Sequence, residues 1–162
     1  MCIRDRRYPG GIGHLRDACG AHVLAEAIEW AGETPACGNQ IYNIANGDVL
    51  MWEDLWPQLA ALFGMECGLA HTFPLARVMA DKADVWDRVV TRHGLQPNGY
   101  AHLVPSWDFT DFSLRSGQAP APLLLSTIKS RKDGFTGCAD SVEMYLDLVR
   151  WYQAERILPA GS

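Results

Sequence analysis

Residues 40–63, QIYNIANGDVLMWEDLWPQLAALF, decide how this chain folds. Residues 41–44 are mostly β-branched or aromatic, which a short buried strand favours. Residues 46–48, Asn-Gly-Asp, predict a tight turn, because Gly and Asn tolerate positive φ and Asx side chains bond to nearby backbone. The remainder predicts an amphipathic helix, because six apolar residues recur at helical spacing: Trp52, Leu55, Trp56, Leu59, Leu62 and Phe63.

Helical patterns also occupy most of the sequence outside this stretch. We expect a first helix with Asp17 as its N-cap, Gly32 at its end and an apolar stripe made by Leu24, Ala27, Ile28 and Ala31. Further helices are expected in residues 74–94, with a break near 81–84, and in residues 107–114 and 126–132. A last helix should begin at a capping box on Asp140 and run to about residue 156. Its expected buried stripe consists of Val142, Tyr145, Leu148, Val149 and Tyr152. The chain should therefore be mostly α, with one or two short strands.

Composition narrows the classes of protein to which the chain can belong. The 162 residues, 48% hydrophobic and 20% charged, suffice for the core of one soluble globular domain. The net charge of −5 argues against a nucleic-acid partner, and no apolar run approaches the roughly 20 residues that cross a membrane. Five cysteines without a CxxC pair predict reduced thiols and a cytoplasmic location.

Motifs for nucleotide binding and catalysis are missing from this sequence. The glycines of residues 11–13 are not followed by a third glycine, since Arg16 takes that position, and no hydrophobic strand precedes them. No tyrosine has a lysine four residues later, so the sequence lacks a local Tyr–Lys pair for hydride-transfer chemistry. We therefore predict no catalytic, cofactor-binding or metal-ligating residues in this chain, and no NADPH binding by the chain alone.

Residues 42–56, YNIANGDVLMWEDLW, resemble a segment of the progesterone 5β-reductase/iridoid synthase-like enzymes. These enzymes are atypical extended short-chain dehydrogenases with a Rossmann-like α/β fold, and they reduce activated C=C bonds with NADPH. The resemblance covers nearly the whole chain and implies a C-terminal, substrate-binding portion in residues 7–162. The half that binds the cofactor and carries the catalytic pair would be missing. Residues 1–6, MCIRDR, look like the translation of a sequencing adapter.

The same resemblance implies a wall of the substrate pocket in residues 106–114. Phe109 matches the family's pocket-lining phenylalanine, with Trp107 beside it and Tyr145 contributed by the last helix. From the residues alone, these aromatics fit either a helix that docks into a core or a pocket wall. Asp108 and Asp111 could form a carboxylate pair for acid–base chemistry, but the i, i+3 spacing also fits any exposed helix face.

The resemblance thus implies part of an NADPH-dependent reductase of small apolar enones. Two alternatives remain: a stand-alone helical module that binds a ligand or partner, and part of a sugar-nucleotide epimerase or dehydratase of the same superfamily. A fragment should expose an apolar patch where the cofactor-binding half packs, with Ile41, Tyr42 and Ile44 on an unpaired strand edge. A complete module should cover these residues.

Overall fold

The computed structural model describes residues 7–115, 117–119 and 121–161. Residues 1–6, for which an adapter origin is predicted, lie outside the described residues. The chain divides into two compact units. Of the described residues, unit 1 consists of 7–14, 52–115, 117–119 and 146–161, and unit 2 consists of 15–51 and 121–145.

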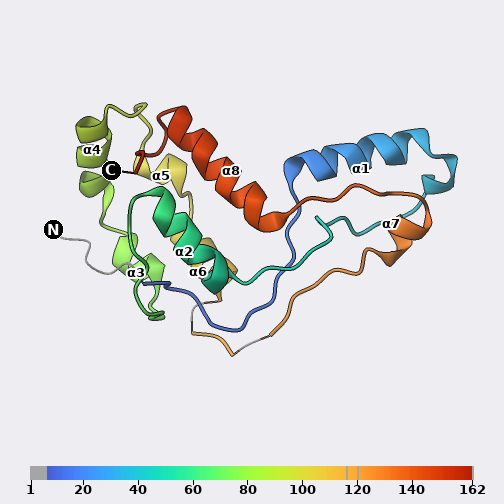
Figure 1. Cartoon of the computed structure of the whole chain (residues 1–162), viewed down its shortest axis with the longest axis horizontal. Helices are drawn as coiled ribbons and strands as arrows, with labels where there is room; N and C mark the ends of the chain where they lie inside the picture. The colour runs from blue at the N-terminus through green and yellow to red at the C-terminus, as the bar shows by residue number, and fades with distance from the viewer. Residues whose placement is uncertain (1–6, 116, 120, 162) are drawn as a thin grey trace. The chain divides into compact units, whose positions relative to one another are not determined.

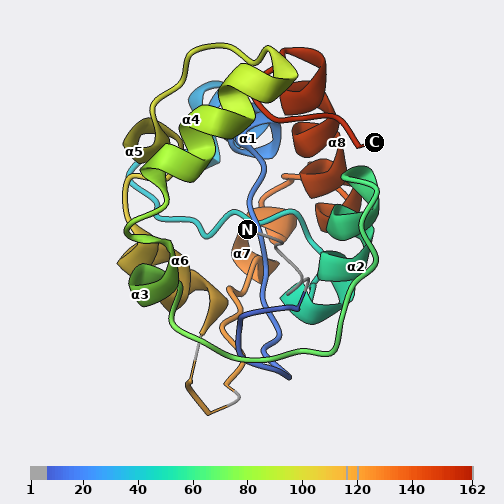
Figure 2. The same ribbon diagram turned by 90° about the vertical axis from the view of Figure 1, so that its left-hand side faces the viewer.

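Unit 1 is built from helices around an aromatic core. Its elements are α2 (Trp52–Leu62), α3 (Leu75–Met79), α4 (Ala83–His93), α5 (Tyr100–Leu103), α6 (Trp107–Leu114) and most of α8 (Ser141–Ala154). Figure 2 shows α3 beside α6, and α4 beside α5. The core cluster consists of Tyr8, Leu75 and Leu114, with Trp52, Trp56, Phe73, Met79 and Trp107 packed against it.

The helix patterns of unit 1 predicted from the sequence are largely confirmed. The α2 helix buries Leu55 completely and keeps the other five apolar residues of its predicted face half-buried. The expected break separates α3 from α4, which ends at Gly94 in the left-handed conformation with φ 58°. The α5 helix was not predicted, because its four residues are too few to show a helical period.

Unit 2 holds α1 (Ala21–Glu33), the 3₁₀ helix η1 (Pro35–Cys37), α7 (Ile128–Lys132) and the first turn of α8 (Figure 1). Its core cluster is Val23, Ala27 and Phe135, with Trp30, Ile44 and Ala139 packed against it. The short helix predicted near residues 126–132 is thus confirmed as α7.

The predicted strand at residues 41–44 is wrong for this chain. In the described part of the chain, β pairing is limited to isolated bridges, which join Arg7 to Gly68 and Arg16 to Leu50 and Leu123. A strand exists only when a second backbone segment pairs with it, and none of the described segments pairs with residues 41–44. The chain is therefore mostly helical, as predicted, but the predicted strand is an unpaired connection (Figure 1).

Of the predicted apolar stripe of α1, Ala27 is buried as expected, but the burial predicted for Leu24, Ile28 and Ala31 is wrong. The α1 helix buries Val23 and Ala27, whereas Leu24 is 46% exposed and Ile28 is 66% exposed. Apolar residues cover a wider arc of this helix than the core of unit 2 can bury. The N-cap is Gly20 instead of the predicted Asp17. The Asp17 carboxylate accepts a hydrogen bond from the backbone N–H of Leu125 at 2.6 Å.

The start of α8 follows the prediction more closely than its buried stripe does. The Asp140 carboxylate accepts a hydrogen bond from the backbone N–H of Glu143 at 2.8 Å, as an N-cap should. The helix ends at Ala154, two residues before the predicted end. Leu146 is buried on this helix, whereas Leu148, which was predicted to be buried, is 42% exposed.

Candidate functional site

The α6 helix carries the predicted pocket-wall residues, and its start is fixed by a cap. The Ser106 hydroxyl accepts a hydrogen bond from the backbone N–H of Phe109 at 3.1 Å. Trp107 points inward, is half-buried and packs against the core of unit 1, with its ring 5.8 Å from that of Tyr100. Trp107 therefore holds α6 on unit 1.

Phe109 and Phe112 form an exposed aromatic surface, which we call the α6 aromatic face. Phe109 is 67% exposed and Phe112 is 56% exposed, and their ring centroids lie 6.4 Å apart. The guanidinium of Arg115 lies 5.6 Å from the centre of the Phe112 ring. Two large aromatic side chains left in water at one place are typical of a surface that receives an apolar ligand or partner.

Asp111 has a structural role that accounts for its position. One carboxylate oxygen accepts a hydrogen bond from the backbone N–H of Leu75 at 2.8 Å, and the other accepts one from that of Ala76 at 2.9 Å. These two amides open α3, where helix N–H groups lack partners within the helix. Asp111 therefore caps α3 and joins it to α6, while Asp108 is exposed. The suggested acid–base pair gains no support from this arrangement.

Tyr145 belongs to unit 2, whereas Trp107 and Phe109 share α6 in unit 1. Tyr145 is half-buried. Burial raises the pKa of its phenol, and the positive charge of Arg16 acts in the opposite direction. Its hydroxyl therefore stays protonated at neutral pH, as a group that contacts an apolar ligand can.

The turn at residues 46–48 forms a buried polar network that sequence reasoning missed. The amide oxygen of Asn46 accepts a hydrogen bond from the backbone N–H of Gly20 at 2.7 Å, and its amide nitrogen donates to the Ser141 hydroxyl at 3.0 Å. The Asp48 carboxylate accepts from both the backbone N–H and the hydroxyl of Ser141. Asn46 and Ser141 are fully buried. The turn therefore joins the starts of α1 and α8, which lie about 120 residues apart along the chain.

Gly47 is required within this turn. Its φ is 103°, a conformation that L side chains rarely adopt, and an added Cβ would lie 2.5 Å from a guanidinium nitrogen of Arg131. The Asn-Gly-Asp sequence predicted the turn correctly. It gave no indication of the distant partner Ser141.

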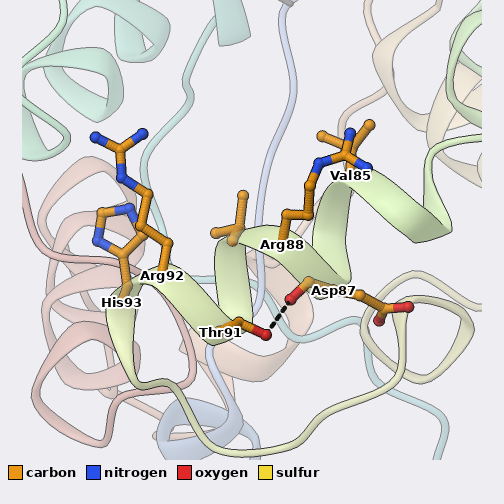
Figure 3. A pocket seen from close by; sticks show the side chains of 7 residues that line it. Val85, Asp87, Arg88, Thr91, Arg92 and His93 are labelled. Atoms are coloured by element: carbon orange, nitrogen blue, oxygen red, sulfur yellow. Dashed lines mark hydrogen bonds between the residues drawn. The ribbon is translucent and has the colours of Figure 1, made fainter.

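An open depression lies on α4 (Figure 3), and all of its lining residues belong to that helix: Val85, Asp87, Arg88, Val89, Thr91, Arg92 and His93. The Thr91 hydroxyl donates a hydrogen bond to the Asp87 backbone carbonyl at 2.9 Å. Among the described residues, no second element contributes to this lining, so side chains from different elements do not converge here. In the part of the chain that the structure describes, no group of His, Cys, Asp or Glu could hold a metal ion. Over the same residues, no helix is both long and apolar enough to cross a membrane.

Comparison with known proteins gives the chain its relatives, although no protein-family model matches it. An (S)-8-oxocitronellyl enol synthase of Nepeta cataria is 35% identical over 164 residues, which cover 96% of this chain and 40% of the relative. A synthase of the same name from Nepeta racemosa is 35% identical over 95% of this chain and 39% of the relative. One from Catharanthus roseus is 33% identical over 94% of this chain and 40% of the relative.

Each of these relatives is named as a synthase of an (S)-8-oxocitronellyl enol. The homologues are iridoid-synthase-type enzymes, which confirms the resemblance predicted from residues 42–56. The chain spans about 40% of the length of these relatives.

Proposed function

We propose that residues 7–162 are the C-terminal, substrate-binding portion of an NADPH-dependent reductase that acts on small apolar enones. The observation that carries this proposal is the similarity to enol synthases over 94–96% of the chain. Two-electron reduction of an enone at its β-carbon leaves an enolate, and protonation of the enolate gives an enol. A relative named for an enol product therefore fits this class of reaction.

The exposed side chains of unit 2 favour a portion of a larger enzyme over a complete helical module. Ile41 is 86% exposed, Leu24 is 46% exposed and Ile28 is 66% exposed. Removing apolar surface from water is favourable by about 25 cal/mol per Å². Large apolar side chains that gather on one surface are therefore normally covered by another part of the protein. Of the three residues predicted for the exposed patch, Ile41 is strongly exposed, whereas Tyr42 and Ile44 are half-buried.

The residues of this chain do not fit the pyrophosphate of NADPH. The backbone N–H of Gly13, in the Gly-rich loop, donates to both carboxylate oxygens of Glu53, at 2.8 and 3.0 Å. That carboxylate would repel a phosphate, and the next helix starts only at Ala21. We therefore place the cofactor site in the part of the whole protein that this chain does not contain. Titration of the chain with NADPH should show no binding, and a dissociation constant on the order of 1 μM would contradict this placement.

Within the proposed enzyme, Phe109 forms an apolar wall of the substrate pocket, with Trp107 behind it as support. The exposed ring of Phe109 has most of its surface available for a ligand, whereas the Trp107 ring packs on the core of unit 1. Tyr145, which belongs to unit 2, is proposed separately as a residue of the same enzyme that contacts substrate, and burial raises the pKa of its phenol. No catalytic residue is proposed among the residues of this chain.

The test begins with the source DNA on the 5′ side of this gene. An open frame that encodes a Gly-rich βα turn and a Tyr–Lys pair would supply the whole protein for enone-reduction assays. In that protein, Phe109→Ala should lower kcat/KM about 10- to 100-fold, because a ligand-covered Phe contributes about 1.5–3 kcal/mol. Trp151→Ala is the matched control, since Trp151 is an exposed aromatic of the same unit at 53% exposure. Unchanged kcat/KM for Phe109→Ala would refute the role of this wall.

A further inference from the structure

Arg115 ends α6 in a backbone conformation that favours glycine. Its φ is 53° and its ψ is 35°, in the left-handed region that a residue with a Cβ seldom adopts. A glycine would relieve this strain, yet the chain carries an arginine at this position. Strained residues of this kind gather at sites where the side chain has a function. We therefore expect the Arg115 side chain to have a role beyond ending the helix.

The guanidinium of Arg115 lies on the α6 aromatic face. It is 5.6 Å from the centre of the Phe112 ring, which is a cation–π distance, and the Phe112 ring is 6.4 Å from that of Phe109. Phe109 and Phe112 are three residues apart on one helix, so they share a face. The exposed apolar surface of these two rings thus ends at a positive charge. This charge lies no farther from the Phe109 ring than the two spacings laid end to end.

The charge of Arg115 has no acidic partner among the described residues, since no carboxylate there lies within 4.0 Å of its nitrogens. The nearest acidic residue along the helix, Asp111, has both carboxylate oxygens bonded to the first amides of α3. Arg115 is half-buried, and its Nε is buried without a hydrogen-bond partner. Buried polar groups in folded proteins are nearly always paired, so the counter-charge is expected from a bound ligand.

Gln118 fixes the guanidinium without neutralising it. The backbone N–H of Gln118 donates to the Arg115 carbonyl at 3.1 Å, which closes a turn. The side-chain amide oxygen of Gln118 accepts a hydrogen bond from Nη1 of Arg115 at 2.7 Å. An amide carries no net charge, so this bond orients the guanidinium and leaves its positive charge available. Nη2 of Arg115 forms no hydrogen bond within the described ranges, so it is the nitrogen that can receive an anion.

We infer that Arg115 and the α6 aromatic face form a subsite for a substrate that carries a carboxylate at the far end of an apolar body. The apolar body would lie on the Phe109 and Phe112 rings, and the carboxylate would pair with the guanidinium. A neutral carbonyl could accept the same hydrogen bond, but only an anion compensates the charge, and charge-assisted bonds are about twice as strong as neutral ones. The inference rests on the proposed function in one respect only, because that function identifies the apolar body as an enone.

The test on this chain compares hexanoate with hexanamide, which have nearly the same shape but differ in charge. Both compounds are titrated at the same ionic strength, because salt screens charge pairs, and the amide signals of α6 are followed by heteronuclear NMR. Hexanoate should bind roughly fivefold more tightly than hexanamide. Arg115→Gly should remove this preference, and glycine suits the left-handed backbone, so the variant keeps its fold. Phe109→Ala should weaken the binding of both compounds, because both rest on its ring.

Arg156→Gly is the matched control for the loss of charge. Arg156 has the same left-handed conformation, with φ 55°, and belongs to the same unit. Its replacement should leave the preference for hexanoate unchanged. The subsite would be overturned by equal affinity for the two compounds, by a preference that survives in Arg115→Gly, or by one that is lost equally in Arg156→Gly. Unchanged affinities in Phe109→Ala, or no binding of hexanoate at about 10 mM, would also overturn it.

Turnover by the whole protein separates this subsite from the proposed function. The probes are a straight-chain enone with a terminal carboxylate and the methyl ester of the same compound. The carboxylate compound should be reduced with a kcat/KM roughly fivefold higher, and Arg115→Gly should abolish this difference. Reduction of neither compound, together with a preference of this chain for hexanoate, would refute the function and support the subsite. Reduction of both compounds at equal kcat/KM would refute the subsite and support the function.

Discussion

Replacement of Asn46 by alanine tests the buried polar network of the turn at residues 46–48. Asn46 is fully buried and joins two helix starts: it accepts from the Gly20 N–H at 2.7 Å and donates to the Ser141 hydroxyl at 3.0 Å. Alanine removes both bonds and cannot replace either. The Gly20 N–H is then left buried with no acceptor, whereas Ser141 keeps its bonds to Asp48.

The expected loss of stability follows from the unpaired Gly20 N–H and from the lost hydrogen bond to Ser141. A buried donor without a partner costs about 1–3 kcal/mol, and the lost bond to Ser141 adds about 0.5–1.5 kcal/mol. We therefore expect Asn46→Ala to lower the free energy of unfolding by about 2–4 kcal/mol. Small domains are stable by about 5–15 kcal/mol, so this loss is a large share of the total.

The assay is urea unfolding followed by tryptophan fluorescence and circular dichroism. Asn43→Ala is the matched control, because Asn43 is exposed and its amide donates one bond, to the Ser126 carbonyl at 3.2 Å. Its loss should stay below about 0.5 kcal/mol. If Asn46→Ala loses no more than Asn43→Ala, the network does not stabilise unit 2 as argued.

Two further predictions concern side chains of unit 1 and the tyrosines. Asp111→Ala should lower the free energy of unfolding by about 0.5–2 kcal/mol, because it removes the α3 cap. Asp108→Ala is the control and should change the free energy of unfolding little. Equal effects of the two variants in urea unfolding would contradict the role of Asp111 as a cap. Burial raises the pKa of Tyr100 and of Tyr145 above the ordinary 10.0. The folded chain then holds more protons than the unfolded chain above about pH 10, so the stability is intact below that pH and falls as the pH rises further. The urea midpoint should therefore drop as the pH rises above about 10. It should drop less in Tyr145→Phe, and an identical drop would exclude Tyr145 as a contributor.

Local chemistry allowed much of the fold to be predicted from the sequence. The α2 face, the Gly94 end of α4 and the Asp140 cap each depend on residues within one or two turns of each other. The strand at residues 41–44 could not be predicted correctly for this chain, because a strand depends on a second segment that only the folded protein supplies. The stripe of α1 was wrong for a related reason: helical spacing identifies apolar residues but not which of them the available core will cover.

In the candidate site, too, local features could be predicted from the sequence, whereas features that depend on distant residues could not. The sequence placed Trp107 and Phe109 on one helix, but their opposite orientations depend on the packing of α6 against Tyr100 and the rest of unit 1. Asp111 was grouped with Asp108 by spacing, and its role was revealed only by the two amides of α3. Ser141 was missed because a buried serine and an Asn-Gly turn about 95 residues away share no local pattern.

The residues that revealed the family and the residues proposed to bind substrate therefore have different physical roles, and two variants can separate them. Asn46 lies in the family-like run, is fully buried and bonds only to other residues of unit 2. Phe109 is 67% exposed and contributes little to the core. In the whole enzyme, Asn46→Ala should lower stability and leave KM unchanged at temperatures where the protein is folded, whereas Phe109→Ala should raise KM and leave stability unchanged. A KM effect from Asn46→Ala in the folded enzyme would contradict this separation of roles.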